Sequence, residues 1–100
     1  MSAEVEVCVL DWSITPFRAD RFLDLWEPAV ARMRSYGAKR WSLTRAIDDP
    51  LSFQQTSVWE SRKDFERWWY SDEVQDIRAS IIDMHVIPIL PTWHTIVAAE

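Results

Sequence analysis

One block of fifteen residues, from position 58 to position 72, constrains the fold more than any other part of this 100-residue chain. Its sequence, VWESRKDFERWWYSD, ends an extended run and then begins a helix at Ser61. Ser61 and Asp64 have the spacing of a capping box, in which each side chain satisfies a backbone N–H of the first turn. Successive helical residues point about 100° apart, so the adjacent Trp68, Trp69 and Tyr70 cannot all face one core. At least one of these rings is expected to line a cavity, a subunit contact or solvent.

Alternation of residue types predicts four strands. The first begins at Val5, where valines alternate with Glu6, Cys8 and Leu10, and Trp12 continues the second face. The alternation in residues 40–47 and 51–59, joined by a short polar link, is typical of a hairpin. A last short strand is expected over residues 93–98.

Helices are expected between these strands. Thr15-Pro16 reads as an N-cap followed by the first helical residue, and Gly37 is placed to end that helix as a left-handed cap. A second helical region starts at Ser61 and breaks near Ser71, and prolines mark residues 82–92 as a linker. The order βαββαβ predicts an α+β, ferredoxin-like single domain over residues 1–100. It has a four-stranded antiparallel sheet with helices on one face.

Such a sheet leaves its second face open. If that face carries Cys8, Leu10 and Trp12, it is too apolar to stay in contact with water, and a second subunit should cover it. The seven tryptophans of the chain point the same way, because tryptophan is enriched in interfaces and ligand pockets. A homodimer that closes two sheets into a barrel is therefore predicted.

Composition excludes several function classes. A net charge of −5 disfavours a nucleic-acid partner, and no apolar run is long enough to span a membrane. The N-terminal residues lack the pattern of a secretory signal, so a soluble cytoplasmic protein is expected. Gly37 is the only glycine, which rules out a P-loop or a dinucleotide-binding motif. Cys8 cannot form an internal disulfide, and two histidines cannot make a three-histidine metal site.

The chain resembles a known group at this point. The pattern Val58-Trp59-x-Ser61-x-x-x-Phe65-x-x-Trp68-x-x-Ser71-Asp72 is similar to the strand-to-helix passage of haem-degrading monooxygenases. By element order the whole chain resembles the antibiotic-biosynthesis-monooxygenase-like (ABM-like) domains of the dimeric α+β barrel superfamily. The haem-degrading members use an asparagine, a tryptophan and a histidine around the haem. Trp68 matches the tryptophan, but Arg78 stands at the histidine position and the chain contains no asparagine. Arginine stays protonated and cannot ligate iron, so haem degradation is not expected.

The cofactor-free monooxygenases of the group are the better analogue. Their resemblance implies oxidation of an aromatic or apolar small molecule, without a cofactor or metal, in a pocket between the sheet and the helices. Such chemistry needs an apolar pocket, a group that holds an anion, and a group that moves a proton. Arg78 is the candidate for the anion, and His85 or His94 for the proton. The candidate substrate-binding walls are Trp68, Trp12 and Trp41.

Each of these residues also has a purely structural interpretation. Trp68 and Trp12 suit a core, and Arg78 is able to pair with Asp76 or Asp83. Two further functions therefore stand beside the enzyme: a non-catalytic homodimer that binds a small ligand, and a structural dimer whose pocket is filled by its own tryptophans. An open cavity beside Trp68 and Arg78 would favour a ligand, and a filled interior would favour structure.

Overall fold

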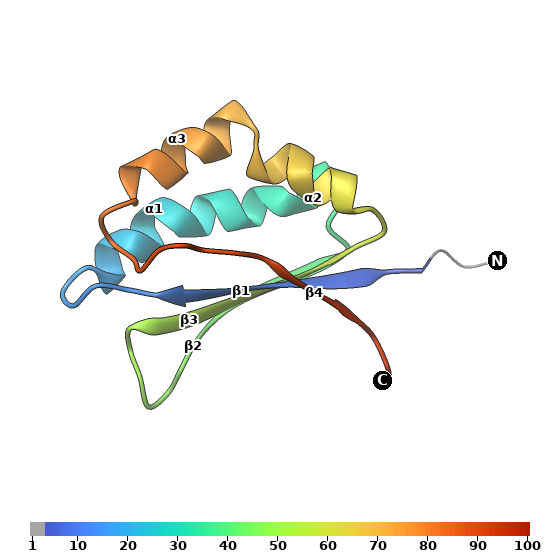
Figure 1. Cartoon of the computed structure of the whole chain (residues 1–100), viewed down its shortest axis with the longest axis horizontal. Helices are drawn as coiled ribbons and strands as arrows, with labels where there is room; N and C mark the ends of the chain where they lie inside the picture. The colour runs from blue at the N-terminus through green and yellow to red at the C-terminus, as the bar shows by residue number, and fades with distance from the viewer. Residues whose placement is uncertain (1–3) are drawn as a thin grey trace.

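The chain, described over residues 4–100 by a computed structural model, alternates strands and helices in the predicted order. The elements are β1 (Glu6–Ser13), α1 (Ala19–Ala31), the 3-10 helix η1 (Arg32–Tyr36), β2 (Arg40–Arg45), β3 (Ser52–Trp59), α2 (Arg62–Trp69), α3 (Asp72–Ser80) and β4 (Thr92–Thr95). The strands form one antiparallel sheet in the order β2-β3-β1-β4. The helices all cover one face and leave the other uncovered, which confirms the ferredoxin-like α+β fold (Figure 1). None of the helices in the described range is both long and apolar enough to cross a membrane.

The two faces of the sheet are the reverse of one sequence-based expectation. Cys8, Leu10 and Trp12 are almost completely buried beneath the helices, so they do not form the open face. A period of two divides a strand into two faces, but it does not say which face the helices cover. The ring of Trp12 is held on the helix side by α1, where it lies 5.3 Å from Phe22 and 5.0 Å from Trp26, measured between ring centroids.

The open face is instead built from β-branched and small polar residues. Val7 and Val9 of β1 alternate with the buried set, and their cross-strand partners on β3 are Val58 and Thr56. These four side chains are partly exposed in the single chain. The uncovered face therefore still carries an apolar strip, but its side chains are smaller than the leucine and tryptophan that the sequence analysis placed there.

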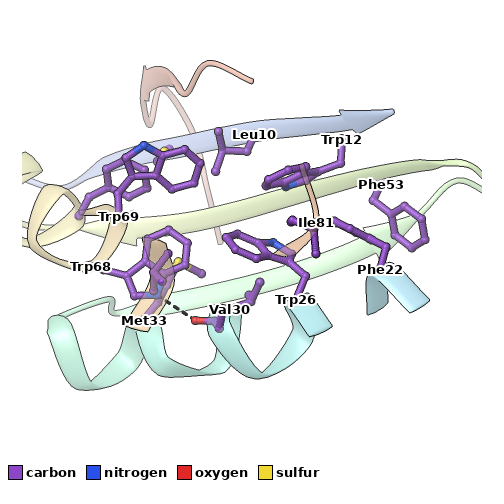
Figure 2. Close-up of a cluster of buried hydrophobic side chains, with 14 of the residues drawn as sticks. Leu10, Trp12, Phe22, Trp26, Val30, Met33, Phe53, Trp68, Trp69 and Ile81 are labelled. Atoms are coloured by element: carbon purple, nitrogen blue, oxygen red, sulfur yellow. Dashed lines mark hydrogen bonds between the residues drawn. The ribbon is translucent and has the colours of Figure 1, made fainter. Parts of the chain in front are cut away.

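Tryptophans fill the space between the sheet and the helices (Figure 2). Four of the seven, Trp12, Trp26, Trp59 and Trp68, are fully buried. A buried indole requires an acceptor for its N–H. Gln55 of β3 serves two of them, since its Oε1 accepts from Trp12 Nε1 at 3.1 Å and from Trp26 Nε1 at 2.8 Å. Its amide nitrogen lies 3.6 Å from Met33 Sδ, so the whole amide group is used inside the core.

The start of α1 differs from the sequence prediction. The helix begins at Ala19 and not at Pro16, because Thr15 to Arg18 form a turn closed by an Arg18 N–H to Thr15 carbonyl bond of 3.1 Å. Phe17 in that turn has φ 69°, a left-handed conformation that a helix cannot contain. Proline suits the second position of a turn as well as the first residue of a helix, and Pro16 occupies the turn position here. The helical region does end at Gly37, whose φ of 116° confirms the predicted left-handed cap.

The motif at the start of α2 is confirmed in part. Ser61 is the N-cap, and its hydroxyl accepts from the Lys63 N–H at 3.2 Å. Asp64 does not complete the box, because its carboxylate binds Arg67 at 3.1 Å. Among the three adjacent aromatics, Tyr70 is the one that faces solvent, with 62% of its surface exposed.

Replacing Gln55 by leucine tests how much its side-chain amide contributes to the free energy of unfolding. The Gln55→Leu variant leaves two indole N–H groups without an acceptor, and each such group costs about 1–3 kcal/mol. We expect the free energy of unfolding, measured by urea denaturation, to fall by about 3 kcal/mol. The control is Gln54→Leu on the exposed side of the same strand, which should change it by about 0.5 kcal/mol or less. Equal effects of the two substitutions would contradict the role of Gln55.

The thiol of Cys8 provides a test of the covered face. Burial raises the pKa of Cys8 from 9.0 to about 12, and a hydrogen bond with Ser57 offsets only part of that rise. The folded chain therefore keeps the thiol proton, and its stability should decline as pH rises from about 9 towards 12. At about pH 8 a thiol reagent such as Ellman's reagent should not react with the native protein. It should titrate one thiol per chain in concentrated guanidinium chloride. Rapid labelling of the native protein would show that Cys8 lies on an accessible face.

Candidate functional site

A cleft lies between α3 and the segment that returns from it to β4. The segment is fastened to the end of β1 by two backbone bonds, from the Thr15 N–H to the Met84 carbonyl at 2.8 Å and from the Val86 N–H to the Ser13 carbonyl at 2.9 Å. Its other end enters the sheet as β4. The chain between these anchors runs beside the helices at the edge of the sheet (Figure 1), and it forms the second wall of the cleft.

The cleft has two hollows that share Arg78 and Ile89, and together they are called the Arg78 cleft below. Hollow 1 has a volume of about 380 Å³. It is lined by Gln75, Arg78 and Ala79 of α3 and by Ile82, His85, Ile87, Pro88 and Ile89 of the returning segment. Hollow 2 has a volume of about 260 Å³. It is lined by Phe65, Glu66, Trp69, Tyr70, Arg78, Ile89, Leu90, Pro91 and Trp93.

Arg78 is the cation at the centre of this cleft. Its guanidinium carbon lies 3.8 Å from the centroid of the Trp69 ring, a close cation–π stack. The ion pairs within residues 4–100 use Arg32, Lys39, Arg62 and Arg67, so the expected alternative of a bond from Arg78 to Asp76 or Asp83 is not formed. Burial lowers the pKa of Arg78 below its ordinary value. The site therefore contains a partly desolvated positive charge without a protein counter-ion.

His85 contributes an imidazole ring to hollow 1. The residue is only 9% exposed, and its ring stands edge-on to Trp12 with 4.9 Å between centroids. Nδ1 lies 3.0 Å from the Val86 carbonyl oxygen, which only accepts, so in the neutral ring Nδ1 carries the proton and Nε2 carries the lone pair. The other ring nitrogen, Nε2, has no hydrogen-bond partner in the described part of the protein. Every buried side-chain nitrogen or oxygen within residues 4–100 does have a partner, so Nε2 is not fully buried. His85 thus gives hollow 1 an imidazole whose Nε2 has no protein partner among these residues.

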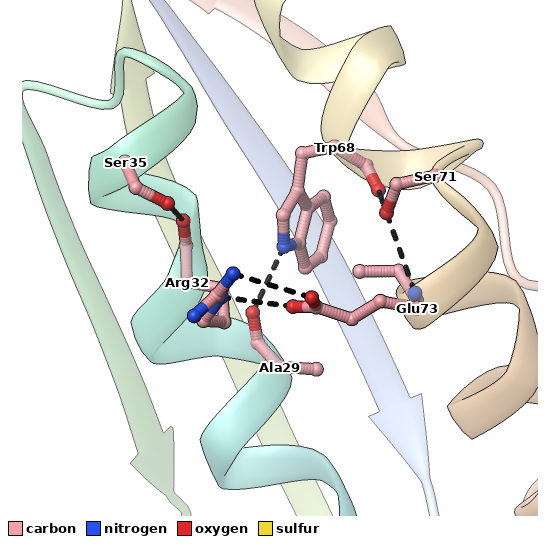
Figure 3. Close-up of polar contacts among 7 residues, drawn as sticks. Ala29, Arg32, Ser35, Trp68, Ser71 and Glu73 are labelled. Carbon is pink, nitrogen blue, oxygen red and sulfur yellow. Dashed lines mark hydrogen bonds and ion pairs between the residues drawn. The ribbon is translucent and has the colours of Figure 1, made fainter.

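Trp68 occupies a different place from Arg78. Its side chain is fully buried, and Nε1 donates to the Ala29 carbonyl of α1 at 2.8 Å (Figure 3). Nearby, an Arg32–Glu73 ion pair at 2.9 Å joins η1 to α3. Trp68 lines neither hollow of the Arg78 cleft.

The remaining candidate residues lie apart from the cleft or behind it. Trp12 is a core ring that packs against His85 of hollow 1. Trp41 is on the edge strand β2, 37% exposed, and lines a separate shallow hollow with neighbours from β2 and β3. His94 is on the open sheet face opposite Val7, with Nε2 2.9 Å from the Thr92 hydroxyl. The structure thus brings together Arg78 and His85 among the predicted residues.

Sequence reasoning missed the aromatic wall of hollow 2. Trp69 stacks on Phe65 with 5.8 Å between centroids, and Phe65 meets Trp93 edge-on at 5.3 Å. Alternation along β4 was a usable signal for Trp93, because it places this ring on the helix side opposite Cys8. Nothing in the local pattern distinguished Trp69 from Trp68 as the partner of Arg78.

Another hollow, of about 520 Å³, lies at the opposite end of β1 and is lined partly by Glu4, Glu6 and Glu60. Glu6 is held by Arg62 at 2.7 Å and Glu60 by Lys39 at 2.9 Å, so two of its three carboxylates are already neutralised. Residues 4–100 also contain no cluster of three or more His, Cys, Asp or Glu side chains arranged for a metal ion. The Arg78 cleft is therefore the stronger candidate site.

Solved structures with the same fold come from diverse organisms. A protein of Nitrosomonas europaea, provisionally described as an antibiotic biosynthesis monooxygenase, superposes with a TM-score of 0.85 at 15% identity over 97% of this chain and 94% of that one. SnoaB, a cofactor-independent oxygenase from Streptomyces nogalater, gives 0.81 at 15% identity over 97% of each chain. A conserved protein of Methanosarcina mazei gives 0.81 at 11% identity over 93% of each. At such identities the likeness shows the fold alone.

Sequence comparison goes further than the fold. No curated protein sequence matches the chain. The family model described as antibiotic biosynthesis monooxygenase, however, matches residues 7–80, which include all of β1 except Glu6, all of the described helices and the Trp69–Arg78 stack. The chain belongs to the antibiotic biosynthesis monooxygenase family.

Proposed function

We propose that this protein is a small cofactor-independent oxygenase that acts, as a homodimer, on an aromatic molecule bound in the Arg78 cleft. The observation that carries the proposal is the unpaired Arg78 guanidinium, stacked on Trp69 between two hollows lined by apolar and aromatic residues. Family membership supports the reaction class, and the cofactor-independent oxygenase SnoaB shares the fold.

The cleft suits a small aromatic ligand. Hollow 1 offers isoleucine and proline side chains for a flat ring, and three polar side chains, Gln75, Arg78 and His85, for its substituents. Sites for small molecules typically combine an apolar lining with a few polar groups that fix orientation. A volume of about 380 Å³ is at the lower end of the range for such sites.

The proposed reaction converts a phenol-type ring to a quinone with molecular oxygen as the oxidant. The ring loses its O–H hydrogen and one ring C–H hydrogen, and it gains one oxygen atom as a second carbonyl. The other oxygen atom leaves with the two hydrogens as water, so the substrate supplies all the electrons. His85 Nε2 accepts the phenol proton, which makes the ring electron-rich enough to reduce oxygen, and Arg78 stabilises the negative charge.

A second function has support from a specific observation. Trp68, which the resemblance places in the haem pocket of other members, is used here to join α1 and α2, and tryptophans fill the interior around it. A protein that only binds an aromatic anion needs Arg78 and the apolar lining but no base. The role of His85 therefore separates a catalyst from a binding module.

The homodimer rests on the uncovered sheet face. Proteins of this fold typically form homodimers. The strip of Val7, Val9, Thr56 and Val58 is partly exposed in the single chain, and a second copy related by two-fold symmetry would bury it. Burial of this strip supplies the driving force for association.

Oxygen uptake with α-naphthol as the probe tests the enzyme. We expect uptake above the protein-free rate, accompanied by naphthoquinone, and a fall in kcat of about 100-fold or more in His85→Gln, because general-base catalysis contributes at least that much. His94→Gln is the matched comparison, since it removes the same side chain from the opposite sheet face. A larger loss in His94→Gln would reverse the assignment. Probe binding without uptake in the wild type would favour the binding module.

Light scattering tests the dimer. We expect the wild type to have twice the mass of one chain at about 10 μM. The Val9→Lys variant should shift towards the monomer, because it places a charge within the apolar strip. Ala31→Lys, at an exposed position of α1 away from the sheet, serves as the control for added charge. A monomeric wild type at this concentration would contradict the proposed dimer but would not affect the argument for the Arg78 cleft.

A further inference from the structure

Arg78 differs from every other basic residue of the chain. The other Arg and Lys side chains are exposed, whereas Arg78 alone is partly buried. Four of the exposed basic side chains form ion pairs with a carboxylate, whereas Arg78 forms none within the described range. A cation that loses water without gaining a counter-ion costs free energy. Such a cost is recovered when a ligand supplies the missing negative charge.

The orientation of the guanidinium is fixed by Trp69. The stack at 3.8 Å covers one face of the group and leaves its N–H edge for a ligand. Phe65 packs against Trp69 nearly in parallel, with 18° between the ring planes, and so keeps the indole in place. A planar guanidinium held in this way presents parallel N–H donors, and the matching acceptor is a group with two coplanar oxygens.

The two hollows are not equivalent for an anion. Glu66 lines hollow 2, so a negative ligand placed there meets a like charge. Hollow 1 contains no acidic residue in its lining. Gln75, one helical turn before Arg78 on the same face of α3, adds an amide donor there. The polar side of hollow 1 is therefore arranged for an anion, and its isoleucines for an apolar ring.

We propose that the ligand of the Arg78 cleft is an aromatic carboxylate, whose carboxylate binds the N–H edge of Arg78 in hollow 1 while its ring packs on the isoleucines of the returning segment. This inference rests on the proposed function only in its use of the same cleft. The carboxylate is a permanent charge of the free ligand, and it is distinct from the phenolate that His85 generates during the reaction. The substrate class is thus narrowed from aromatic molecules to hydroxyaryl carboxylic acids.

Isothermal titration with two probes of the same shape tests the carboxylate. Naphthalene carboxylate and naphthalene carboxamide differ in charge but hardly in size. We expect the wild type to bind the carboxylate at least about 10-fold more tightly, because a charge-assisted bidentate bond replaces a neutral one. In Arg78→Gln the ratio should fall to about 1. Arg78→Lys, which retains the charge but not the planar fork, should give an intermediate ratio.

The control is Arg34→Gln, which changes the net charge equally at an exposed position outside the cleft. Its binding ratio should equal that of the wild type, and circular dichroism should show that all variants are folded. Equal binding of the two probes by the wild type, or a preference that survives in Arg78→Gln, overturns the carboxylate inference. The α-naphthol assay reports separately, since that probe has no carboxylate. Failure of both probes to bind while α-naphthol is oxidised overturns only the carboxylate, and failure of all three overturns the oxygenase as well.

Discussion

Two indole N–H groups that share one amide oxygen hold the interior of this protein together. Four fully buried tryptophans bring four donors into a region without water, and each donor has an acceptor. Gln55 serves Trp12 and Trp26, the Ala29 carbonyl serves Trp68, and the Ser57 hydroxyl serves Trp59 at 2.7 Å. Without these acceptors, the free-energy cost of four unpaired indole N–H groups would offset part of the stabilisation gained by burying the rings. Gln55 is central because it lies on β3, opposite β1, and reaches both the sheet-borne Trp12 and the helix-borne Trp26.

A filled interior determines where a ligand is able to bind. The Trp68 side chain is committed to α1 through its bond to Ala29, so it is not available to line a pocket. The next residue along α2 points in another direction, and Trp69 therefore meets Arg78 of α3 at the edge of the core. The resemblance suggested a site beside Trp68 and Arg78, whereas the structure stacks Arg78 on Trp69. One step along the helix thus leads from a ring enclosed by α1 to a ring that also lines a hollow.

Local patterns predicted the elements well, and the reasons for their failures are physical. Alternation, the Ser61 cap and the Gly37 cap depend on residues close in sequence, and all three are confirmed. The side of the sheet that Cys8, Leu10 and Trp12 occupy depends on helices far along the chain, and the expectation for it was wrong. The start of α1 failed because Pro16 fits a turn and a helix equally, and only the left-handed Phe17 decides between them. For the site, Arg78 and His85 came from residue chemistry and resemblance. Their meeting in one hollow requires the returning segment, whose path no local pattern encodes.

The proposed roles of Arg78 and His85 follow from the difference between a permanent and a transient charge. Arg78 is positive in the empty protein, so in the proposed function its main energetic contribution comes when an anionic ligand binds, before any bond changes. The proposed role of His85 begins only when a proton moves, and the contact of its Nδ1 with the Val86 carbonyl leaves Nε2 to accept that proton. Ile82, Ile87 and Leu90 remain exposed around these two groups, and a flat ring laid over them would exclude the water that weakens both interactions. In the proposed function the apolar rim would thus link binding to chemistry, because the ligand itself would provide the low-dielectric surroundings in which an imidazole and a guanidinium act most strongly.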